Sequence, residues 1–205
     1  MLLAGCLCAY LIGGVPWALL VVRLCKRVDL RTIGSGNVGA TNARRAFATA
    51  RGRLLAFCGI YLLDAGKGLV PAWLGPALVG GDPALAGALL GASAILGHVF
   101  PPYLRFKGGK GVATATGVLF ALDWLVALCA IGTFFVVLAA TQRVFFGSLA
   151  LGLALAAAAI LLHRDDAFAA RLPVTLLCCA CALFLVWTHR SNLHKHFAAA
   201  RGTAP

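Results

Sequence analysis

The chain has 205 residues, of which 61% are hydrophobic and only 12% charged, and its mean hydropathy is +0.93. In a soluble domain roughly a quarter of the residues are charged. This composition therefore excludes a soluble globular protein and indicates an integral membrane protein. The formal net charge is +12, but the cations lie in short loops between apolar runs. That pattern suits a membrane surface, and no nucleic-acid partner is expected.

Apolar runs long enough to cross a bilayer occur at five places. A span needs about 20 apolar residues, or fewer where neighbouring helices shelter it. The beginning of the chain has no cationic segment and no small-residue cleavage site, so we interpret it as a retained first span and not as a signal peptide. The five predicted spans are residues 2–22, 54–76, 84–100, 144–162 and 173–188.

The apolar stretch between residues 111 and 141 is too long for one span. A single helix of that length would extend about 45 Å at about 1.5 Å per residue, well beyond the hydrocarbon core. Asp123 and Trp124 interrupt it, and a carboxylate beside an indole is typical of a membrane interface. We therefore predict a short helix ending near Leu122 and another from Trp124 to Thr141, which gives an all-α polytopic membrane protein with about seven transmembrane helices.

The charges of the loops orient this predicted protein. With the N-terminus outside and the C-terminus in the cytoplasm, Arg164 and Arg171 fall outside and Lys67 lies within a span, so 15 of the 18 cations lie inside. This matches the excess of lysine and arginine in cytoplasmic loops. Merging the two short helices into one span would leave 13 cations inside and 4 outside. Charge alone therefore does not decide whether the number of spans is odd or even.

A first polar segment, IGSGNVGATNARR, covers Ile33–Arg45. Its glycines allow tight turns, its serine, threonine and asparagines offer short hydrogen-bonding side chains, and its arginines offer forked cations. Such a mixture suits an anion; the alternative is a solvated loop with cytoplasmic arginines. The candidate residues are Ser35, Gly36, Asn37, Gly39, Asn42 and Arg45.

A second polar segment follows the third predicted span. Pro101 and Pro102 stop the incoming helix, and the sequence FKGGKG places two lysines among three glycines before the next helix begins. Backbone N–H groups, the positive end of that helix and the lysine charges together predict a phosphate site. The alternative is a flexible basic turn on anionic lipid. The candidate residues are Lys107, Gly108, Gly109, Lys110 and Gly111.

A third polar segment, THRSNLHKH, covers Thr188–His196 after the last predicted span. His189 and Asn192 are three residues apart and share one face if the helix continues, so they can orient one substrate group together. The alternative is a basic tail on lipid headgroups. We predict no metal site here, because no acid or cysteine lies nearby.

Ionisable residues inside the predicted spans are further candidates. Asp64 and Lys67 lie three residues apart and can form an ion pair that offsets the cost of burial. Their role is either structural or functional, and His98 either caps its helix or reaches into the site. Cys178 and Cys181 form a CxxC inside an apolar run, which favours packing over metal binding or redox chemistry.

At these segments the chain resembles the bacterial acyl-phosphate:glycerol-3-phosphate acyltransferases. The family's SGNxGATNxxR matches Ser35–Arg45, and its DxxKG matches Asp64–Gly68. Its GHxFPxxxxFKGGKGVAT matches the stretch that includes His98–Thr114. The likeness covers nearly the whole chain, so residues 1–205 are expected to form a single integral membrane acyltransferase domain.

The resemblance implies transfer of a fatty acyl group from acyl phosphate to the 1-hydroxyl of glycerol-3-phosphate. The products are lysophosphatidic acid and phosphate, in the first step of phospholipid synthesis. No cofactor or metal is implied. The protein would lie in the bacterial cytoplasmic (inner) membrane as a multi-pass protein, with a functional link to the enzyme that makes acyl phosphate.

The resemblance also implies roles for residues in each polar segment. Ser35 and Arg45 would hold the acyl phosphate, and Lys107 to Gly111 would hold the glycerol-3-phosphate. His189 and Asn192 would complete the pocket. The proton of the attacking hydroxyl would go to a substrate phosphate oxygen, which we favour, or to His189.

Three departures from the family pattern leave other interpretations open. The third segment has Ser191 where relatives carry an acid, followed by Leu193 and Lys195; Val144–Phe146 stand where relatives commonly carry serines; and no acid follows Gly202. A family member with an altered acceptor or a non-catalytic binding role is one alternative. A small anion transporter is another, although the chain shows no internal repeat and its polar segments lie at the edges of spans.

Overall fold

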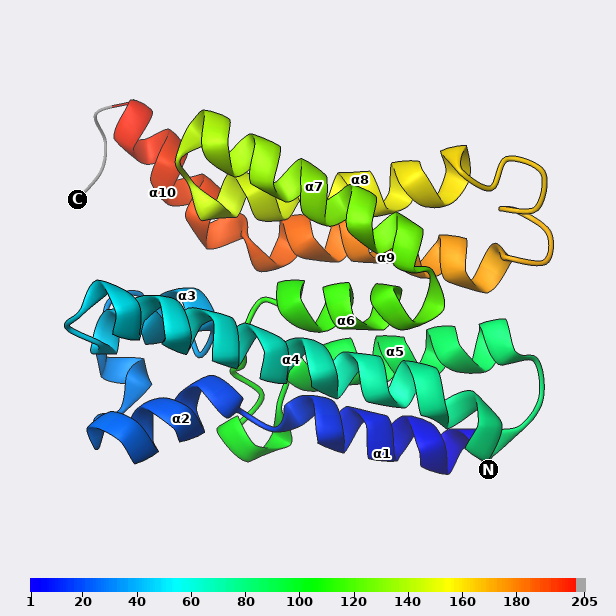
Figure 1. The fold of residues 1–205 in the computed structure, drawn as a ribbon, viewed down its shortest axis with the longest axis horizontal. Helices are drawn as coiled ribbons and strands as arrows, with labels where there is room; N and C mark the ends of the chain where they lie inside the picture. The colour runs from blue at the N-terminus through cyan, green and yellow to red at the C-terminus, as the bar shows by residue number, and fades with distance from the viewer. Residues whose placement is uncertain (202–205) are drawn as a thin grey trace. The chain divides into compact units, whose positions relative to one another are not determined.

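The computed structural model describes residues 1–201, and within that range it consists of helices joined by loops (Figure 1). The chain forms two compact units, Met1–Leu122 and the residues from Asp123 onward. The all-α prediction is confirmed for the described residues. A single domain over residues 1–205 stays a prediction.

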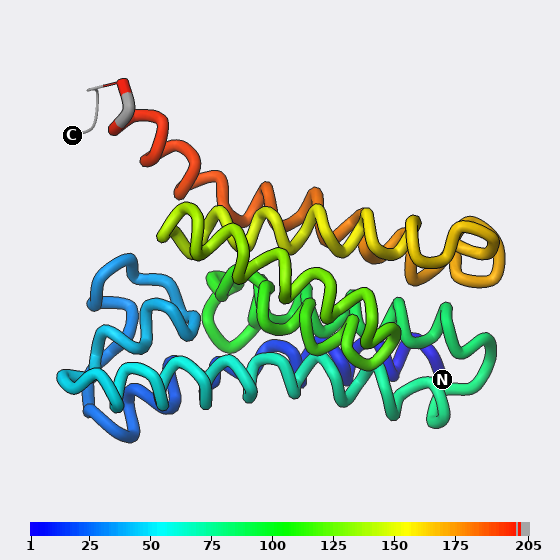
Figure 2. The backbone as a smooth tube through the Cα atoms, turned by 45° about the horizontal axis from the view of Figure 1, so that its top comes forward, coloured from blue at the N-terminus to red at the C-terminus, as the bar shows by residue number. Residues whose placement is uncertain are grey.

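The first unit is organised around one long helix, α4 (Ala50–Val79). Its other elements are α1 (Leu2–Gly14), α2 (Trp17–Lys26), η1 (Leu30–Thr32), α3 (Ala40–Ala43), η2 (Arg44–Ala46), α5 (Pro83–Val99), η3 (Pro102–Leu104) and α6 (Val112–Leu122). α4 packs against α1, α5 and α6, which run beside it in Figures 1 and 2. The short elements α2, α3 and η2 also contact α4.

Small residues let the helices of the first unit approach one another closely. A Cβ atom at Gly13 would overlap the backbone carbonyl of Ala94 in α5. One at Gly97 would overlap the carbonyl of Tyr10 in α1. Lipid offers no hydrophobic drive for two helices to associate, so such close backbone contact is a principal source of packing energy.

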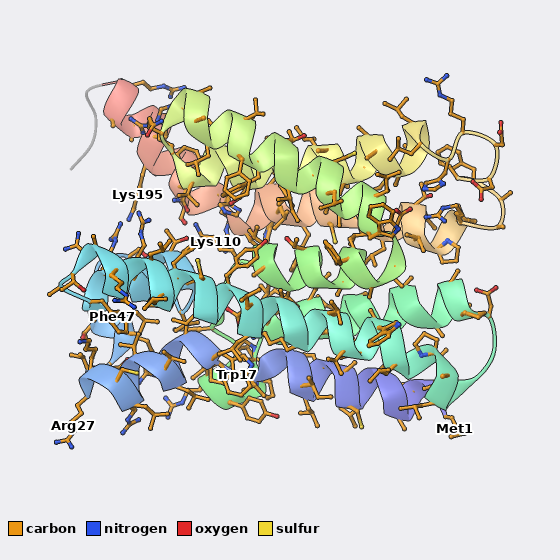
Figure 3. All side chains as sticks on the ribbon, viewed as in Figure 1. Met1, Trp17, Arg27, Phe47, Lys110 and Lys195 are labelled. Atoms are coloured by element: carbon orange, nitrogen blue, oxygen red, sulfur yellow. The ribbon has the colours of Figure 1, made fainter. Side chains whose placement is uncertain are left out.

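The first predicted span, residues 2–22, is two helices with a break at Val15 and Pro16. Proline has no N–H and cannot continue the hydrogen bonds of α1, and the carbonyl of Val15 accepts from Lys67 Nζ of α4 at 2.8 Å. The apolar run continues to Lys26 and is 25 residues long. Trp17, labelled in Figure 3, lies where the two helices meet.

The second unit consists of α7 (Trp124–Thr141), α8 (Val144–Leu161), α9 (Leu172–Thr188) and α10 (Arg190–Ala200). α8 packs against both α7 and α9. α10 continues from α9 after a bend of 49°. The two predicted spans after Asp123 and the last predicted span are therefore confirmed as helices.

The predicted interruption at Asp123 is confirmed, and its side chain explains it. Asp123 Oδ1 accepts from the Val126 backbone N–H at 3.1 Å and so caps α7. Asp123 Oδ2 accepts from His163 Nε2 at 2.6 Å and also pairs with the Arg171 guanidinium. With only 7% of its surface exposed, this carboxylate clamps the start of α7 to the connection between α8 and α9.

The number of membrane crossings stays a prediction. Among the described residues, 5 helical segments have the length and composition to cross a membrane, or up to 6 if α9 and α10 form one broken span. α6 has 11 residues, about 16 Å at about 1.5 Å per residue, and is shorter than the hydrocarbon core. It packs against α4 and α5 instead of standing alone. The count of seven, the outer N-terminus and the cytoplasmic C-terminus therefore stay predictions.

Candidate functional site

The first polar segment is folded around one buried side chain, Asn42, which is 3% exposed. Asn42 Oδ1 accepts from the Ser35 backbone N–H at 3.2 Å. Its Nδ2 donates to the carbonyls of Ile33 and Asn37 at 2.9 and 3.1 Å, with a longer contact of 3.3 Å to Leu30. The amide is engaged by the backbone of the loop itself, so Asn42 shapes the loop and is not in a position to bind a substrate directly.

The side chain of Arg45 lies against the start of the same loop. Gly34 has a φ of 54°, in the left-handed region that glycine adopts without steric cost. A Cβ atom at Gly34 would overlap the Arg45 guanidinium and lie 2.6 Å from Asn42 Oδ1. Gly36 also has a positive φ, 70°. Ser35 is exposed on a tight turn between these two glycines, and Arg45 contacts the first of them.

Three arginines surround an open cavity at this end of the first unit. Arg44, Arg45 and Arg53 line a space of about 390 Å³. Arg53 is fixed at the rim, because its Nε donates to the Phe47 carbonyl at 3.0 Å. Guanidinium groups gathered around one cavity attract an anion and can bind phosphate oxygens in pairs.

The acid that precedes the first polar segment, Asp29, is neutralised by its own neighbour. The carboxylate of Asp29 accepts from the backbone and the guanidinium of Arg31, with a closest distance of 2.6 Å. These hydrogen bonds lower the pKa of Asp29 to about 2. Asp29 therefore stays ionised and paired throughout the neutral pH range and competes little for the cavity arginines.

The second polar segment lies on the end of α5. Gly108 and Gly109 donate their backbone N–H groups to the carbonyls of Val99 and His98, at 3.0 and 3.1 Å. A Cβ atom at Gly108 would overlap these carbonyls, and one at Gly109 would overlap the His98 ring. The expectation that these two N–H groups face an anion is wrong, because both fix the loop to α5. The two glycines allow the loop to approach α5 closely.

The two cations of this segment flank the fixed glycines. Lys107 is exposed, and Lys110, labelled in Figure 3, is partly exposed just before α6. Gly111 has a φ of 85° and turns the chain into α6, which begins at Val112. Two lysines and the positive end of a helix therefore occur together, as the sequence predicts.

Both polar segments lie at the same end of the first unit. Leu104, in the second segment, packs against a hydrophobic cluster that also includes residues of α2, α4 and the first segment. Figure 3 shows Arg27 and Phe47 at this end of the unit and Met1 at the other. Gly39, a candidate ligand, precedes α3 at this end. The buried members of the cluster are Ala18, Leu19, Val22, Leu30, Val38, Ala40, Ala43 and Ile60.

The ionisable residues within the helices form one buried cluster. Asp64 Oδ1 lies 2.8 Å from Lys67 Nζ and 3.7 Å from His98 Nδ1. The three residues are 2%, 6% and 7% exposed. The predicted ion pair is confirmed, and the His98 ring points into this cluster while its carbonyl holds Gly109.

The third polar segment belongs to the second unit. His189 occupies the bend between α9 and α10 and is 2% exposed. Its Nδ1 lies 2.9 Å from the Leu185 carbonyl; because a carbonyl only accepts, Nδ1 carries the hydrogen, and Nε2 is the basic nitrogen of the neutral ring. Asn192 donates its backbone N–H to the His189 carbonyl at 2.9 Å. A pocket completed by these residues stays a prediction.

No cluster of histidine, cysteine or acidic residues that could hold a metal ion occurs among the residues that the structure describes. Cys178 and Cys181 are buried in α9 as free thiols. The stretch after Gly202, where the family's acid is missing, lies outside the described residues. The candidate residues of the three polar segments carry hydroxyl, amide, imidazole and cationic groups, which suit phosphorylated ligands.

Three residues of this arrangement are missing from the predicted set. Gly34 leaves the space that the Arg45 guanidinium occupies next to the loop, yet the sequence identifies it only as one of several turn glycines. The signal was its place directly before the serine of the motif. Arg44 and Arg53 were also not predicted as lining residues, because nothing in their spacing shows that they converge on one cavity.

Comparison with known proteins identifies a family that matches nearly the whole chain. A family profile described as glycerol-3-phosphate acyltransferase matches residues 3–199. The glycerol-3-phosphate acyltransferase of Jannaschia sp. (strain CCS1) is 43% identical over 201 residues, which cover 97% of this chain and 89% of that protein. That of Shouchella clausii (strain KSM-K16) is 39% identical over 197 residues, covering 96% and 93%.

Two crystal structures share the fold along the whole chain. Both are of PlsY (YgiH), an integral membrane glycerol 3-phosphate acyltransferase. The glycerol 3-phosphate form has a TM-score of 0.83 and 29% identity, with 100% of this chain and 94% of that chain covered. The lysophosphatidic acid form has a TM-score of 0.81 and 27% identity over the same shares. The multi-pass membrane fold therefore has an experimental counterpart.

Proposed function

This chain belongs to the glycerol-3-phosphate acyltransferase family, and we propose that it transfers a fatty acyl group from acyl phosphate to the 1-hydroxyl of glycerol-3-phosphate. The products are lysophosphatidic acid and inorganic phosphate. The two related crystal structures, a glycerol 3-phosphate form and a lysophosphatidic acid form, support this acceptor and this product. The acyl-phosphate donor is supported by the three sequence motifs.

The observation that carries the proposal is the position of the Arg45 guanidinium against Gly34, the residue that precedes Ser35. A serine on a glycine turn next to a guanidinium can bind a phosphate oxygen, and Arg45 also lines the cavity with Arg44 and Arg53. In the proposed reaction this pair holds the phosphate of the donor. Ser35 acts as a ligand and not as a nucleophile.

The acceptor binds at the second polar segment in this proposal. Lys107 and Lys110 hold the phosphate of glycerol-3-phosphate, assisted by the positive end of α6 after Gly111. Both lysines belong to a loop whose backbone is hydrogen-bonded to α5. Their Cα atoms therefore have fixed positions. A fixed anion site costs little reorganisation when the acceptor binds.

In the chemical step the protein mainly positions the two substrates and stabilises the developing negative charge. No covalent acyl-enzyme intermediate is required. The 1-hydroxyl oxygen attacks the acyl carbon, the bond from that carbon to the phosphate oxygen breaks, and the hydroxyl proton passes to a phosphate oxygen. Arg45 and neighbouring donors stabilise the charge on the departing phosphate. The sequence resemblance alone supports His189 and Asn192 as further residues of the acceptor site, with His189 as the alternative proton acceptor.

The proposed location follows from the substrates. The long acyl chain of the donor stays in the bilayer while both phosphates face water, so the polar segments lie at the cytoplasmic surface. We place the protein in the bacterial cytoplasmic membrane, with seven spans forming one acyltransferase domain. An enzyme that makes acyl phosphate is then its functional partner.

The experiment is synthesis of lysophosphatidic acid by the purified protein from palmitoyl phosphate and labelled glycerol-3-phosphate, with palmitoyl-CoA as the alternative donor. We expect product from palmitoyl phosphate alone. Ser35→Ala and Arg45→Ala should each lower kcat/KM by about 10²- to 10³-fold, the usual cost of losing one transition-state ligand. Lys110→Ala should chiefly raise the KM for glycerol-3-phosphate.

The matched control is Arg164→Ala, an exposed arginine in the connection between α8 and α9, which should leave all rates unchanged. Full activity of both the Ser35 and Arg45 variants would remove the donor site from the proposal. A folded protein that makes no product from either donor would contradict the proposed function. It would favour an altered acceptor or a binding role, consistent with Ser191 in the third segment.

A further inference from the structure

The buried cluster of Asp64, Lys67 and His98 touches both the helix framework and the glycine loop. Asp64 and Lys67 come from α4, and His98 comes from the last turn of α5. Lys67 Nζ contacts Asp64 at 2.8 Å and also donates to the Val15 carbonyl at 2.8 Å. The charges of the cluster are therefore balanced inside the helix bundle, where an unpaired ion would be costly.

The His98 ring fills the space between this pair and the loop. Its Nδ1 edge faces Asp64 Oδ1 at 3.7 Å. On the other side, a Cβ atom built at Gly109 would overlap His98 Nε2 and lie 2.9 Å from Cε1 and 3.0 Å from Cδ2. The ring therefore lies directly beneath the Gly109 backbone, with no room for a side chain between them.

The backbone of the same histidine fixes the loop a second time. The His98 carbonyl accepts from Gly109 N–H at 3.1 Å, and the neighbouring Val99 carbonyl accepts from Gly108 N–H at 3.0 Å. Lys107 and Lys110 directly flank these two glycines in the sequence. A shift of Gly109 by a fraction of an ångström therefore moves both cations.

We propose that His98, which lies between Asp64 and the loop, is a positioning residue that sets the distance of the Gly108–Gly109 backbone from α5 and thereby the affinity for glycerol-3-phosphate. The His98 ring touches neither substrate. It acts through the positions of Lys107 and Lys110. The inference rests on the proposed function, since it takes those two lysines as the acceptor's phosphate ligands. It assigns the intramembrane ion pair a task in substrate recognition as well as in stability.

The kinetic test is His98→Ala, with KM measured for each substrate at saturation of the other. We expect the KM for glycerol-3-phosphate to rise at least about tenfold, a usual consequence of a small misplacement of binding groups. The KM for acyl phosphate should change less than about twofold, because the first segment is built around Asn42 and does not depend on His98. Equal losses for both substrates, or no change in either, would overturn the proposal.

The matched control is Leu90→Ala, which opens a cavity in the same helix at a site buried to 2% exposure and should lower the melting temperature without a selective change in KM. The double variant His98→Ala/Gly109→Ala gives a second test. Gly109→Ala alone should raise the KM for glycerol-3-phosphate, because its Cβ overlaps the ring. Removal of the ring makes room for that Cβ, so the double variant should be less impaired than the sum of the two single changes. Strict additivity would contradict direct packing of the ring on the loop.

Hydrogen exchange separates this inference from the proposed function. The amides of Gly108 and Gly109 should exchange slowly in the wild type and at least about tenfold faster in His98→Ala, with Leu90→Ala like the wild type at these two positions. Wild-type protein that makes no lysophosphatidic acid would contradict the proposed function, while the exchange rates would still decide the anchoring. Unchanged protection in His98→Ala would overturn the inference even in an active enzyme.

Discussion

Ser35 depends on a residue that does not face the substrates. The Asn42 amide accepts from the Ser35 N–H and donates to two carbonyls of the same loop at 3.1 Å or less. A buried side chain with several backbone partners holds one loop conformation, because each partner would lose its hydrogen bond in any other. If Ser35 binds the donor as proposed, the motif asparagine contributes to that binding by fixing the shape of the loop.

Replacing this amide should damage both the loop and the reaction. Asn42→Ala leaves the Ser35 N–H and two carbonyls without their partner, and we expect a loss of about 2 kcal/mol in stability. Activity should fall by about 10²-fold, because Ser35 and Arg45 no longer hold their relative position. Thermal unfolding in detergent and the acyltransferase rate measure the two effects.

The control is Thr32→Ala, which removes one exposed hydrogen bond from Thr32 Oγ1 to the Asp29 carbonyl. Its effect on stability should stay within about 0.5 kcal/mol. Wild-type turnover by Asn42→Ala would show that Ser35 needs no such support.

Among the elements, α4 does more than cross the membrane. Lys67 sits in its middle, pairs with Asp64 and reaches the Val15 carbonyl, where Pro16 interrupts the first span. One side chain thus offsets the burial of an acid and satisfies a carbonyl at a helix break. An unpaired buried carboxylate and an unsatisfied carbonyl are each costly in free energy inside a membrane.

Removing one charge of this pair should cost more than removing both. Lys67→Met leaves the Asp64 carboxylate buried and unpaired, and we expect a loss of about 3–5 kcal/mol. The double variant Asp64→Asn/Lys67→Met contains no buried charge at these positions and should recover most of that loss. Melting temperatures of the two variants in one detergent measure the difference. A double variant as unstable as the single one would show that the pair does not compensate charge.

The elements themselves were largely predictable from the sequence, because long apolar runs end at polar residues. The predicted stretches 84–100 and 124–141 agree with α5 and α7 to within a residue or so. The break at Pro16 was missed, because the run on either side of it is uniformly apolar. Lys67, which donates to the Val15 carbonyl at this break, lies 52 residues further along the chain.

That the polar segments form an anion site stays a prediction. Composition and motifs indicate which loops are suited to bind anions, but not which N–H groups point outward. Gly108 and Gly109 turn theirs towards α5, and Asn42 turns its amide into the loop. These directions depend on contacts between elements distant in sequence, so residue type and spacing do not reveal them.

For the whole molecule, charge asymmetry is the basis of the predicted orientation. In the first unit the arginine-rich segments lie at one end, and the connection between α4 and α5 contains Asp82. Lysine and arginine prefer the cytoplasmic side. This asymmetry predicts that the candidate site faces the cytoplasm.

Fusion reporters can test the orientation directly. Alkaline phosphatase joined to the C-terminus should be inactive, because it stays in the cytoplasm when the chain crosses the membrane seven times. The same reporter joined after Gly81, at the predicted outer connection between α4 and α5, should be active. An active C-terminal fusion would mean an even number of crossings and would place α10 outside.

The shortness of α6 bears on how this protein is assembled during synthesis. With 11 residues, it is too short to be inserted into lipid as an independent segment. Its seat is complementary in shape: a Cβ at Gly117 would overlap the carbonyl of Ala65, and one at Gly68 would overlap that of Thr114. α4 and α5 leave the ribosome before α6. The surface against which α6 packs can therefore form before α6 itself is made.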